Sequence, residues 1–257
     1  MISTQTSKTT TLACAALVAG TTLLTVTPSE GQAQNRLFNP PEQCEVFLTV
    51  QMKGCLVSNH WQCDADPEGH TWSALATDRG VAIFSQFDSE FQWLASLSTV
   101  GGDDEVLREN PTDPASLSEL LETGLDSYDF EMVEPGEDGE VTRRIRGFDQ
   151  LTGDTVTISG EELLVTEYAM VQTLADGTTS EAFGTQFVSE KYRTFFLGEE
   201  TETRNGETRE SDHAPILMLT EGDSGFRSTR PLFGCGAEDI SAPGHGLLDR
   251  LMDASLQ

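Results

Sequence analysis

The stretch CEVFLTVQMKGCLVSNHWQC, residues 44–63, has the pattern of two short strands joined by a tight turn. A two-residue turn at Lys53-Gly54 is favoured, because glycine adopts the backbone angles that a tight hairpin needs. Counting outward from this turn places Val46 opposite Trp61 and Leu48 opposite Asn59. One face of the hairpin is then apolar except for the asparagine, and the other face is mostly polar. The sequence therefore predicts an antiparallel hairpin whose apolar face is directed inward.

The same register makes a covalent prediction. Cys44 and Cys63 face each other at the open end of the hairpin as a hydrogen-bonded pair, whose Cα atoms lie about 5.5 Å apart. A disulfide tolerates Cα separations of roughly 4.4–6.8 Å, so we predict a Cys44–Cys63 bond. Cys55 and Cys235 are then left to pair with each other. Local pairing of Cys55 is the alternative, because four cysteines allow three connectivities.

The first 33 residues are predicted to be a secretory signal peptide. Lys8 supplies a positive start, residues 12–24 are apolar, and Gly31 and Ala33 are small residues before the predicted cleavage point. Cys14 is expected to be lost with this segment; a lipid anchor is the alternative, although Cys14 precedes the apolar run. We expect residues 34–242 to form a single disulfide-linked β domain and residues 243–257 a C-terminal helix or tail. No later run is long and apolar enough for a membrane helix.

The chain is strongly acidic. It has 43 aspartates and glutamates against 15 lysines and arginines, a net charge of −28, and the acids are spread along the sequence. Such a surface repels nucleic acid and anionic lipid, so neither is an expected partner. The charge is interpreted as a device for solubility in a salty environment, with binding of cations or a basic partner as the alternative. The cysteine count fits an oxidising compartment, which predicts a periplasmic or secreted protein.

Short strands at regular spacing predict a mainly β fold. We expect an antiparallel meander that forms a strongly twisted sheet, a barrel or a half-barrel. A turn at residues 149–154 is expected to separate two strands, and residues 186–197 are expected to form one long strand. Further strands are expected at residues 70–76, 81–87, 91–97, 128–133, 141–147, 156–159, 162–174 and 216–219.

One short helix, residues 114–123, is expected to cover one side of the sheet. Asp113 is a good N-cap, Pro114 is favoured at the first helical position, and Gly124 stops the helix. The segment 226–237 contains a proline and is expected to be irregular, held by the disulfide.

Two motifs resemble functional sites, and we interpret both as turns. Residues 64–69, DADPEG, have the acid spacing of a calcium loop, but the twelfth position is Leu75 instead of a bidentate glutamate. Residues 222–225, GDSG, resemble the nucleophile motif of chymotrypsin-like serine proteases, but that family has another glycine where this chain has Phe226. We therefore assign neither motif a metal or a catalytic role.

The remaining candidates for chemistry do not form a recognisable constellation. The four histidines, His60, His70, His213 and His245, lack zinc-site spacing. Phosphate-binding and dinucleotide-binding glycine loops are missing. The sequence therefore predicts no catalytic residue, no cofactor and no metal site, and an enzyme is the less favoured class.

Aromatic residues fall on several adjacent predicted strands. They are expected to form a core if the sheet is closed, or to line a cavity for an apolar ligand if the sheet is open and curved. They are Trp72, Phe84, Phe87, Phe91, Trp93, Tyr168, Phe187, Tyr192, Phe195 and Phe196.

Four short segments carry a resemblance: residues 59–63 (NHWQC), 113–116 (DPAS), 151–156 (LTGDTV) and 234–236 (GCG). They are similar to a group of uncharacterised exported proteins of alphaproteobacteria. The resemblance implies an exported protein and implies no activity.

Three functions follow as hypotheses. The leading one is a non-catalytic exported binding or carrier protein of the cell envelope, with an apolar small molecule or an envelope protein as partner. The second is a hydrolase whose site is assembled from distant loops. The third is a structural or partner-binding module, which predicts a flat apolar patch and no cavity.

Overall fold

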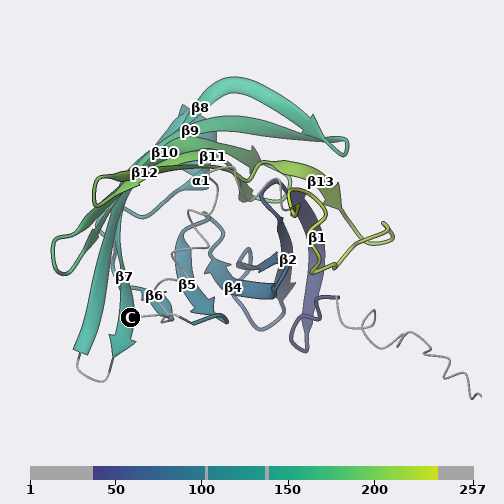
Figure 1. Ribbon diagram of the computed structural model, residues 1–257, viewed down its shortest axis with the longest axis horizontal. Coiled ribbons are helices and arrows are strands. Elements are labelled where there is room, and N and C mark those ends of the chain that lie inside the picture. The colour runs from purple at the N-terminus through teal and green to yellow at the C-terminus, as the bar shows by residue number, and fades with distance from the viewer. Residues whose placement is uncertain (1–36, 102–103, 137–138, 237–257) are drawn as a thin grey trace, which may run out of the picture. The chain divides into compact units, whose positions relative to one another are not determined.

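Thirteen antiparallel strands form one sheet, and all but the last follow each other in sequence order across it. Figure 1 shows the computed structural model, which describes residues 37–101, 104–136 and 139–236. The sheet is strongly twisted and not closed, so the predicted mainly β fold is confirmed in its half-barrel form. The strands are β1 (Cys44–Met52), β2 (Leu56–Cys63), β3 (Thr71–Thr77), β4 (Gly80–Phe87), β5 (Trp93–Ser98), β6 (Glu105–Leu107), β7 (Leu125–Gly136), β8 (Gly139–Ile158), β9 (Glu161–Leu174), β10 (Thr179–Ser189), β11 (Thr194–Arg204), β12 (Glu207–Asp212) and β13 (Pro215–Leu219).

The two edges of the sheet are joined by a short connection. Strand β12 pairs with β11, whereas β13 pairs with β1 at the other end of the strand order. Between them, the His213 N–H donates to Gly198 O in β11, and Ala214 O accepts from the Lys53 N–H. This connection brings the chain back to the first hairpin, which therefore pairs on both sides.

The first hairpin keeps its predicted register at the open end and is shifted by one residue from Leu48 to the turn. Cys44 faces Cys63 as expected, but Leu48 pairs with His60 instead of Asn59. Leu48 is therefore on the inner side of the sheet together with His60, which was predicted to lie on the polar face. Asn59 lies on the opposite face, so the predicted sorting of this part of the hairpin is wrong.

Two single-residue insertions explain the difference. The turn contains three residues rather than two, because Cys55 also adopts a left-handed backbone, with φ 61°. This extra residue shifts the register by one position. A bulge between Val46 and Leu48 adds a residue to the other strand and restores the predicted register at the open end.

Both predicted disulfides are present. Cys44 bonds to Cys63, with Cα atoms 3.9 Å apart, and Cys55 bonds to Cys235 across 180 residues. The short Cα separation corrects the expected 5.5 Å spacing. The Asp64 N–H donates to Gln43 O, so the next pair of residues, Cys44 and Cys63, occupies the narrow non-hydrogen-bonded position.

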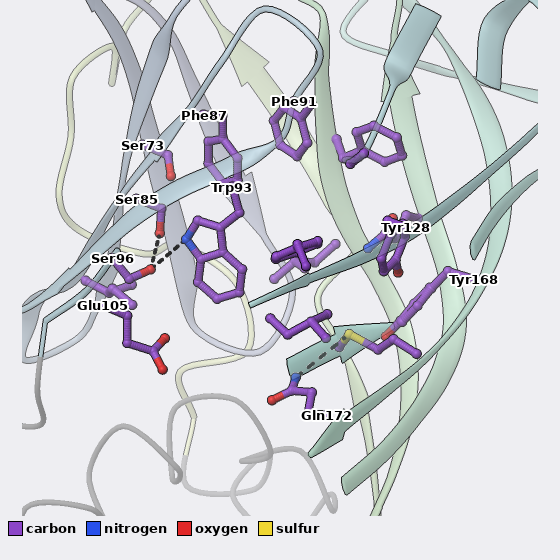
Figure 2. A pocket seen from close by; sticks show the side chains of 18 of the residues that line it. Ser73, Ser85, Phe87, Phe91, Trp93, Ser96, Glu105, Tyr128, Tyr168 and Gln172 are labelled. Carbon is purple, nitrogen blue, oxygen red and sulfur yellow. Dashed lines mark hydrogen bonds between the residues drawn. The ribbon is translucent and has the colours of Figure 1, made fainter. Parts of the chain in front are cut away.

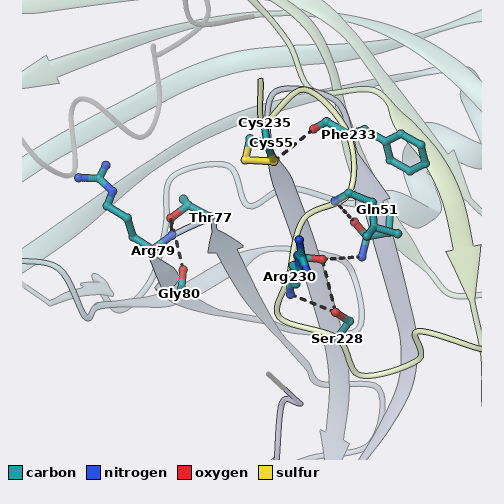
Figure 3. The surroundings of a disulfide bond; sticks show 10 residues. Gln51, Cys55, Thr77, Arg79, Gly80, Ser228, Arg230, Phe233 and Cys235 are labelled. Atoms are coloured by element: carbon teal, nitrogen blue, oxygen red, sulfur yellow. Dashed lines mark hydrogen bonds between the residues drawn. A yellow bond between two sulfur atoms is a disulfide. The ribbon is translucent and has the colours of Figure 1, made fainter. Parts of the chain in front are cut away.

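The Cys55–Cys235 bond holds an irregular segment, residues 226–236, against the outer face of the first strands (Figure 3). Polar side chains of β1 and β2 bind its backbone. Gln51 donates to Arg230 O and accepts from the Leu232 N–H, and Asn59 donates to Ser228 O. These bonds explain why polar residues on this face are fully buried. Both faces of this part of the sheet are therefore covered.

The long strands correct two predictions. Strand β8 runs without interruption from Gly139 to Ile158, so the predicted turn at residues 149–154 is wrong. A bulge between Leu151 and Thr155, with Gly153 at φ 87°, replaces that turn. The predicted strand at residues 186–197 is divided into β10 and β11 by a turn after Ser189.

The predicted helix is present but starts later. Helix α1 (Leu117–Thr123) has Ser116 as its N-cap, whose hydroxyl accepts from the Glu119 N–H, and Gly124 ends it as expected. Asp113, the predicted N-cap, instead forms a β-bridge with Asp129. Leu117 and Leu120 are buried against side chains of β10 and β11, so the helix covers one side of the sheet.

The predicted signal peptide and C-terminal helix or tail, together with His245, lie outside the described residues. Among the residues that the structure describes, no helix is long and apolar enough to cross a membrane.

Candidate functional site

The concave face of the half-barrel encloses a cavity of about 550 Å³. Side chains of β1–β11 and of the segment that leads into α1 line it, and its lining is mostly apolar. Figure 2 shows the cavity with Ser73, Ser85 and Ser96 on one side and Tyr128 and Tyr168 on the other. We call the first side, from β2 to β5, the serine wall, and the second side, from β7 to β11, the acidic wall.

The serine wall is built from one row of small polar residues. Ser73 pairs with Ser85, and Ser85 pairs with Ser96, so their side chains point to the same face from three adjacent strands. Ser96 accepts from the Trp93 indole N–H at 2.8 Å, and its hydroxyl lies 3.4 Å from that of Ser85. Because these serine side chains are small, they leave space on the concave face of the sheet, and this space is part of the cavity.

Aromatic rings form the end of the cavity near α1. Phe87 stacks on Phe91 with ring centroids 4.2 Å apart, and Phe91 contacts Phe195 at 5.0 Å. Phe91 has a left-handed backbone, with φ 63°, in the turn that joins β4 to β5. Trp93 completes this apolar surface and stands in the centre of Figure 2.

One arginine inside the cavity is already neutralised. Arg143 forms a two-pronged ion pair with Glu105, in which Nε lies 3.0 Å from Oε1, and its Nη1 donates to Gln172 at 2.8 Å. Its guanidinium group lies over the ring of Trp93, 5.1 Å from the centroid. Arg143 therefore contacts Trp93 and balances one partly buried carboxylate.

The acidic wall carries a row of four side chains in register across five strands. Asp126 pairs with Asp149, Asp149 with Tyr168, and Tyr168 with Gly184, which pairs with Glu200. Gly184 has no side chain, so the Tyr168 hydroxyl reaches across it and donates to Glu200 at 2.6 Å. Two carboxylates, Asp126 and Asp149, are left side by side at the other end of this row.

Asp126 and Asp149 are buried, with 4% and 8% of their surfaces exposed. The Ser116 N–H donates to Oδ2 of Asp126 at 2.9 Å, but Oδ1 of each aspartate has no hydrogen-bond partner among the described residues. Burial, together with the charge of Asp126, raises the pKa of Asp149 to about 7. Burial and the neighbouring acids Glu119, Asp113 and Glu90 raise the pKa of Asp126 to about 6, although the Ser116 bond opposes the change.

Tyr128 lies beside the two aspartates. It pairs with Gly147, and its ring covers this glycine so closely that a Cβ there would lie 2.7 Å from the hydroxyl. Burial is the main cause that raises the pKa of Tyr128, and the charges of Asp149 and Asp126 add to it. Its hydroxyl makes no hydrogen bond with any described residue, and its side chain lines the cavity.

One histidine and one serine also meet in the cavity. The Ser58 hydroxyl lies 2.9 Å from Nε2 of His60. Burial lowers the pKa of His60 to about 4, so this histidine is neutral near pH 7. Its ring lies against Phe47 and Phe196, and no carboxylate in the described chain hydrogen-bonds to it. The orienting acid of a catalytic triad is therefore missing here.

The other candidate residues of the sequence lie outside the cavity. The four described cysteines form the two disulfides, and His213 packs beneath Gly54 in the first turn. Asp223 of the GDSG motif closes a turn by accepting from Thr220. No group of three or more possible metal ligands occurs in the part of the chain that is described.

The ten predicted aromatic residues divide between core and cavity. Trp72 and Phe84 pack on the outer face, and Phe187 and Tyr192 pack into the core. The other six line the cavity: Phe87, Phe91, Trp93, Tyr168, Phe195 and Phe196.

Sequence reasoning missed the acidic row because it placed Asp149 in a turn. The signal was present in the hairpin between β7 and β8. Counting outward from the pairing of Gly136 with Gly139 brings Asp126 opposite Asp149. Two acids directly opposed on an inward face are unfavourable for a sheet, which marks them as candidates for function.

Comparisons with protein-family models, with curated proteins and with solved structures give no match. The resemblance to exported proteins of alphaproteobacteria therefore remains a prediction.

Proposed function

We propose that the protein is a non-catalytic binding or carrier protein that holds an apolar small molecule in the concave cavity of its sheet. The single observation that carries this proposal is the cavity itself, with a volume of about 550 Å³ and a mostly apolar lining. Volumes of roughly 300–1,000 Å³ are typical of sites for small molecules. Most of its polar side chains are on strands, which suits orientation of a ligand.

Two disulfides support an exported protein, because such bonds persist in oxidising compartments. A periplasmic or secreted carrier is the finer form of the proposal. In this role the apolar body of the ligand contacts the rings of Phe87, Phe91 and Trp93. The serine row provides space without large side chains.

The test is binding of a neutral apolar dye, N-phenyl-1-naphthylamine, whose emission increases in apolar surroundings. We expect the purified protein to bind about one dye molecule. The variant S73F should lose most of this binding, because the new ring occupies the space of the cavity next to the serine wall. T157F, with a ring at an exposed position of β8, is the matched control and should bind normally. Equal binding by S73F and the native protein would reject the cavity as the site.

A hydrolase is the second candidate, because the Ser58 and His60 side chains are within hydrogen-bond distance inside the cavity. A neutral histidine with no acid bonded to it is a weak activating base. Hydrolysis of p-nitrophenyl butyrate decides the question: turnover that S58A abolishes would establish this activity. Absence of turnover, or turnover unchanged in S58A, would reject it.

A further inference from the structure

We infer that the cavity selects a ligand with a cationic head, a protonated amine attached to an apolar body, and that Asp126, Asp149 and the Tyr128 hydroxyl bind this head. The inference rests on the proposed function, because it assigns the ligand class of the same cavity. Three independent features of the acidic wall support it.

The first feature is a pair of unsatisfied oxygens. Asp126 and Asp149 are more than nine-tenths buried and line the cavity, and Oδ1 of each has no partner in the described residues. A buried carboxylate oxygen without a donor is costly, and native proteins rarely leave one unsatisfied. An ammonium group has three donors and can bind both carboxylates at once where these two aspartates line the cavity.

The second feature is uncompensated charge. Neither aspartate forms an ion pair with any described lysine, arginine or histidine, and the charges that act most on Asp126 are those of Glu119, Asp113 and Glu90. Arg143, which also lines the cavity, is already bound by Glu105. A cation placed between the two aspartates removes their mutual repulsion, whereas an anionic head would increase it.

The third feature is the chemistry beside the aspartates. The rings of Tyr128 and Phe130 lie 5.9 Å apart and line the cavity next to Leu117 and Ile145. Aromatic faces attract organic cations, and the Tyr128 hydroxyl has no partner in the described chain. Calcium takes roughly 6–8 oxygen ligands, more than two aspartates and a phenol provide, and no group of three or more possible metal ligands occurs in the described chain. An amine on an apolar body fits both parts of this surface.

The experiment compares three ligands with the same twelve-carbon chain and different heads: dodecylammonium, dodecanol and dodecanoate. Binding to the purified protein is measured by calorimetry at about pH 8, below the concentrations at which these compounds form micelles. We expect dodecylammonium to bind at least about tenfold more tightly than dodecanol, and dodecanoate to bind most weakly. In D126N/D149N the ammonium should bind only as well as dodecanol, whose own affinity should be unchanged.

D154N is the matched control, because Asp154 is an exposed aspartate on the same strand as Asp149. It should keep the preference for ammonium. A preference that survives in D126N/D149N, or equal binding of all three ligands, would overturn the cationic site and leave the apolar cavity standing. Failure of all three ligands to bind would reject the proposed function together with this inference. If the double variant unfolds, D149N alone repeats the test, because it keeps the bond between Asp126 and Ser116.

Discussion

The two walls of the cavity are built on opposite principles. Hydrogen bonds join Ser85, Ser96 and Trp93 on the serine wall, and the β1–β2 hairpin at one end of this wall is covered on its outer face by residues 226–236 and fixed by two disulfides. The acidic wall buries two carboxylates whose Oδ1 atoms lack partners in the described residues. On the outer face of the same strands, large apolar side chains such as Phe183 and Phe148 are exposed. Under the proposed function, the serine wall is the support of the site and the acidic wall is the part that binds the ligand.

The largest expected effect is loss of the covalent support of the serine wall. Replacing both cysteines in C55A/C235A should lower the free energy of unfolding by about 5 kcal/mol, because this bond closes a loop of 180 residues. C44A/C63A, which opens a loop of 19 residues, should cost about 3 kcal/mol. Urea unfolding measures both. Equal losses, or a larger loss in C44A/C63A, would contradict the idea that the long-range bond anchors this wall.

On the acidic wall, removal of a charged group should raise the free energy of unfolding, whereas loss of a disulfide lowers it. D149N should raise the free energy of unfolding at about pH 8 by on the order of 3 kcal/mol, because it removes a buried charge. The pKa of Asp149 is raised to about 7, so the folded protein holds this proton more tightly than the unfolded chain does.

The sign of the pH dependence follows from that shift. Between about pH 4 and pH 7 the contribution of Asp149 to stability falls as the pH rises, and above pH 7 it has reached its lowest value. The advantage of D149N should therefore be near zero at about pH 4 and complete at about pH 8. Urea unfolding at both pH values measures it. An advantage that does not change with pH would show that Asp149 is not a buried ionisable group.

Removal of a polar group from the serine wall should instead destabilise the protein. S96A removes the acceptor of the Trp93 indole, so the free energy of unfolding should fall by about 1 kcal/mol. The loss should be modest because Trp93 also donates to Ala95 O at 3.0 Å. Urea unfolding measures this loss. Stabilisation by S96A would contradict the expectation that the two walls respond in opposite directions when a polar group is removed.

The smallest effect is expected for an exposed acid on the acidic wall. D154N should change the free energy of unfolding by less than about 0.5 kcal/mol at any pH, since Asp154 is exposed. It separates the effect of burial from that of the overall negative charge. Stabilisation by D154N as large as that by D149N would assign the effect to total charge.

The sequence predicted the serine wall better than the acidic wall, and local turn chemistry explains why. The β1–β2 hairpin was predicted from its glycine and its cysteines, and only the extra turn residue at Cys55 and the bulge after Val46 were missed. These insertions depend on backbone geometry that residue types do not determine. They also moved His60 into the cavity.

The acidic wall depends on the long strand β8, in which the sequence predicts a turn at residues 149–154. Residues 149–154 contain the turn formers Asp149, Gly153 and Asp154, but pairing with β9 before and after the bulge at Gly153 keeps them within β8. Tertiary pairing overrides local propensity at this point. The assignment of Asp149 to a turn concealed its position opposite Asp126.

The most direct test of the central claim is a crystal structure of the protein with dodecylammonium bound. The account predicts one molecule in the cavity, with its chain along Trp93 and Phe91 and its nitrogen within hydrogen-bond distance of Asp126 and Asp149. A ligand bound on the outer face of the sheet, or one whose nitrogen points away from both aspartates, would contradict it.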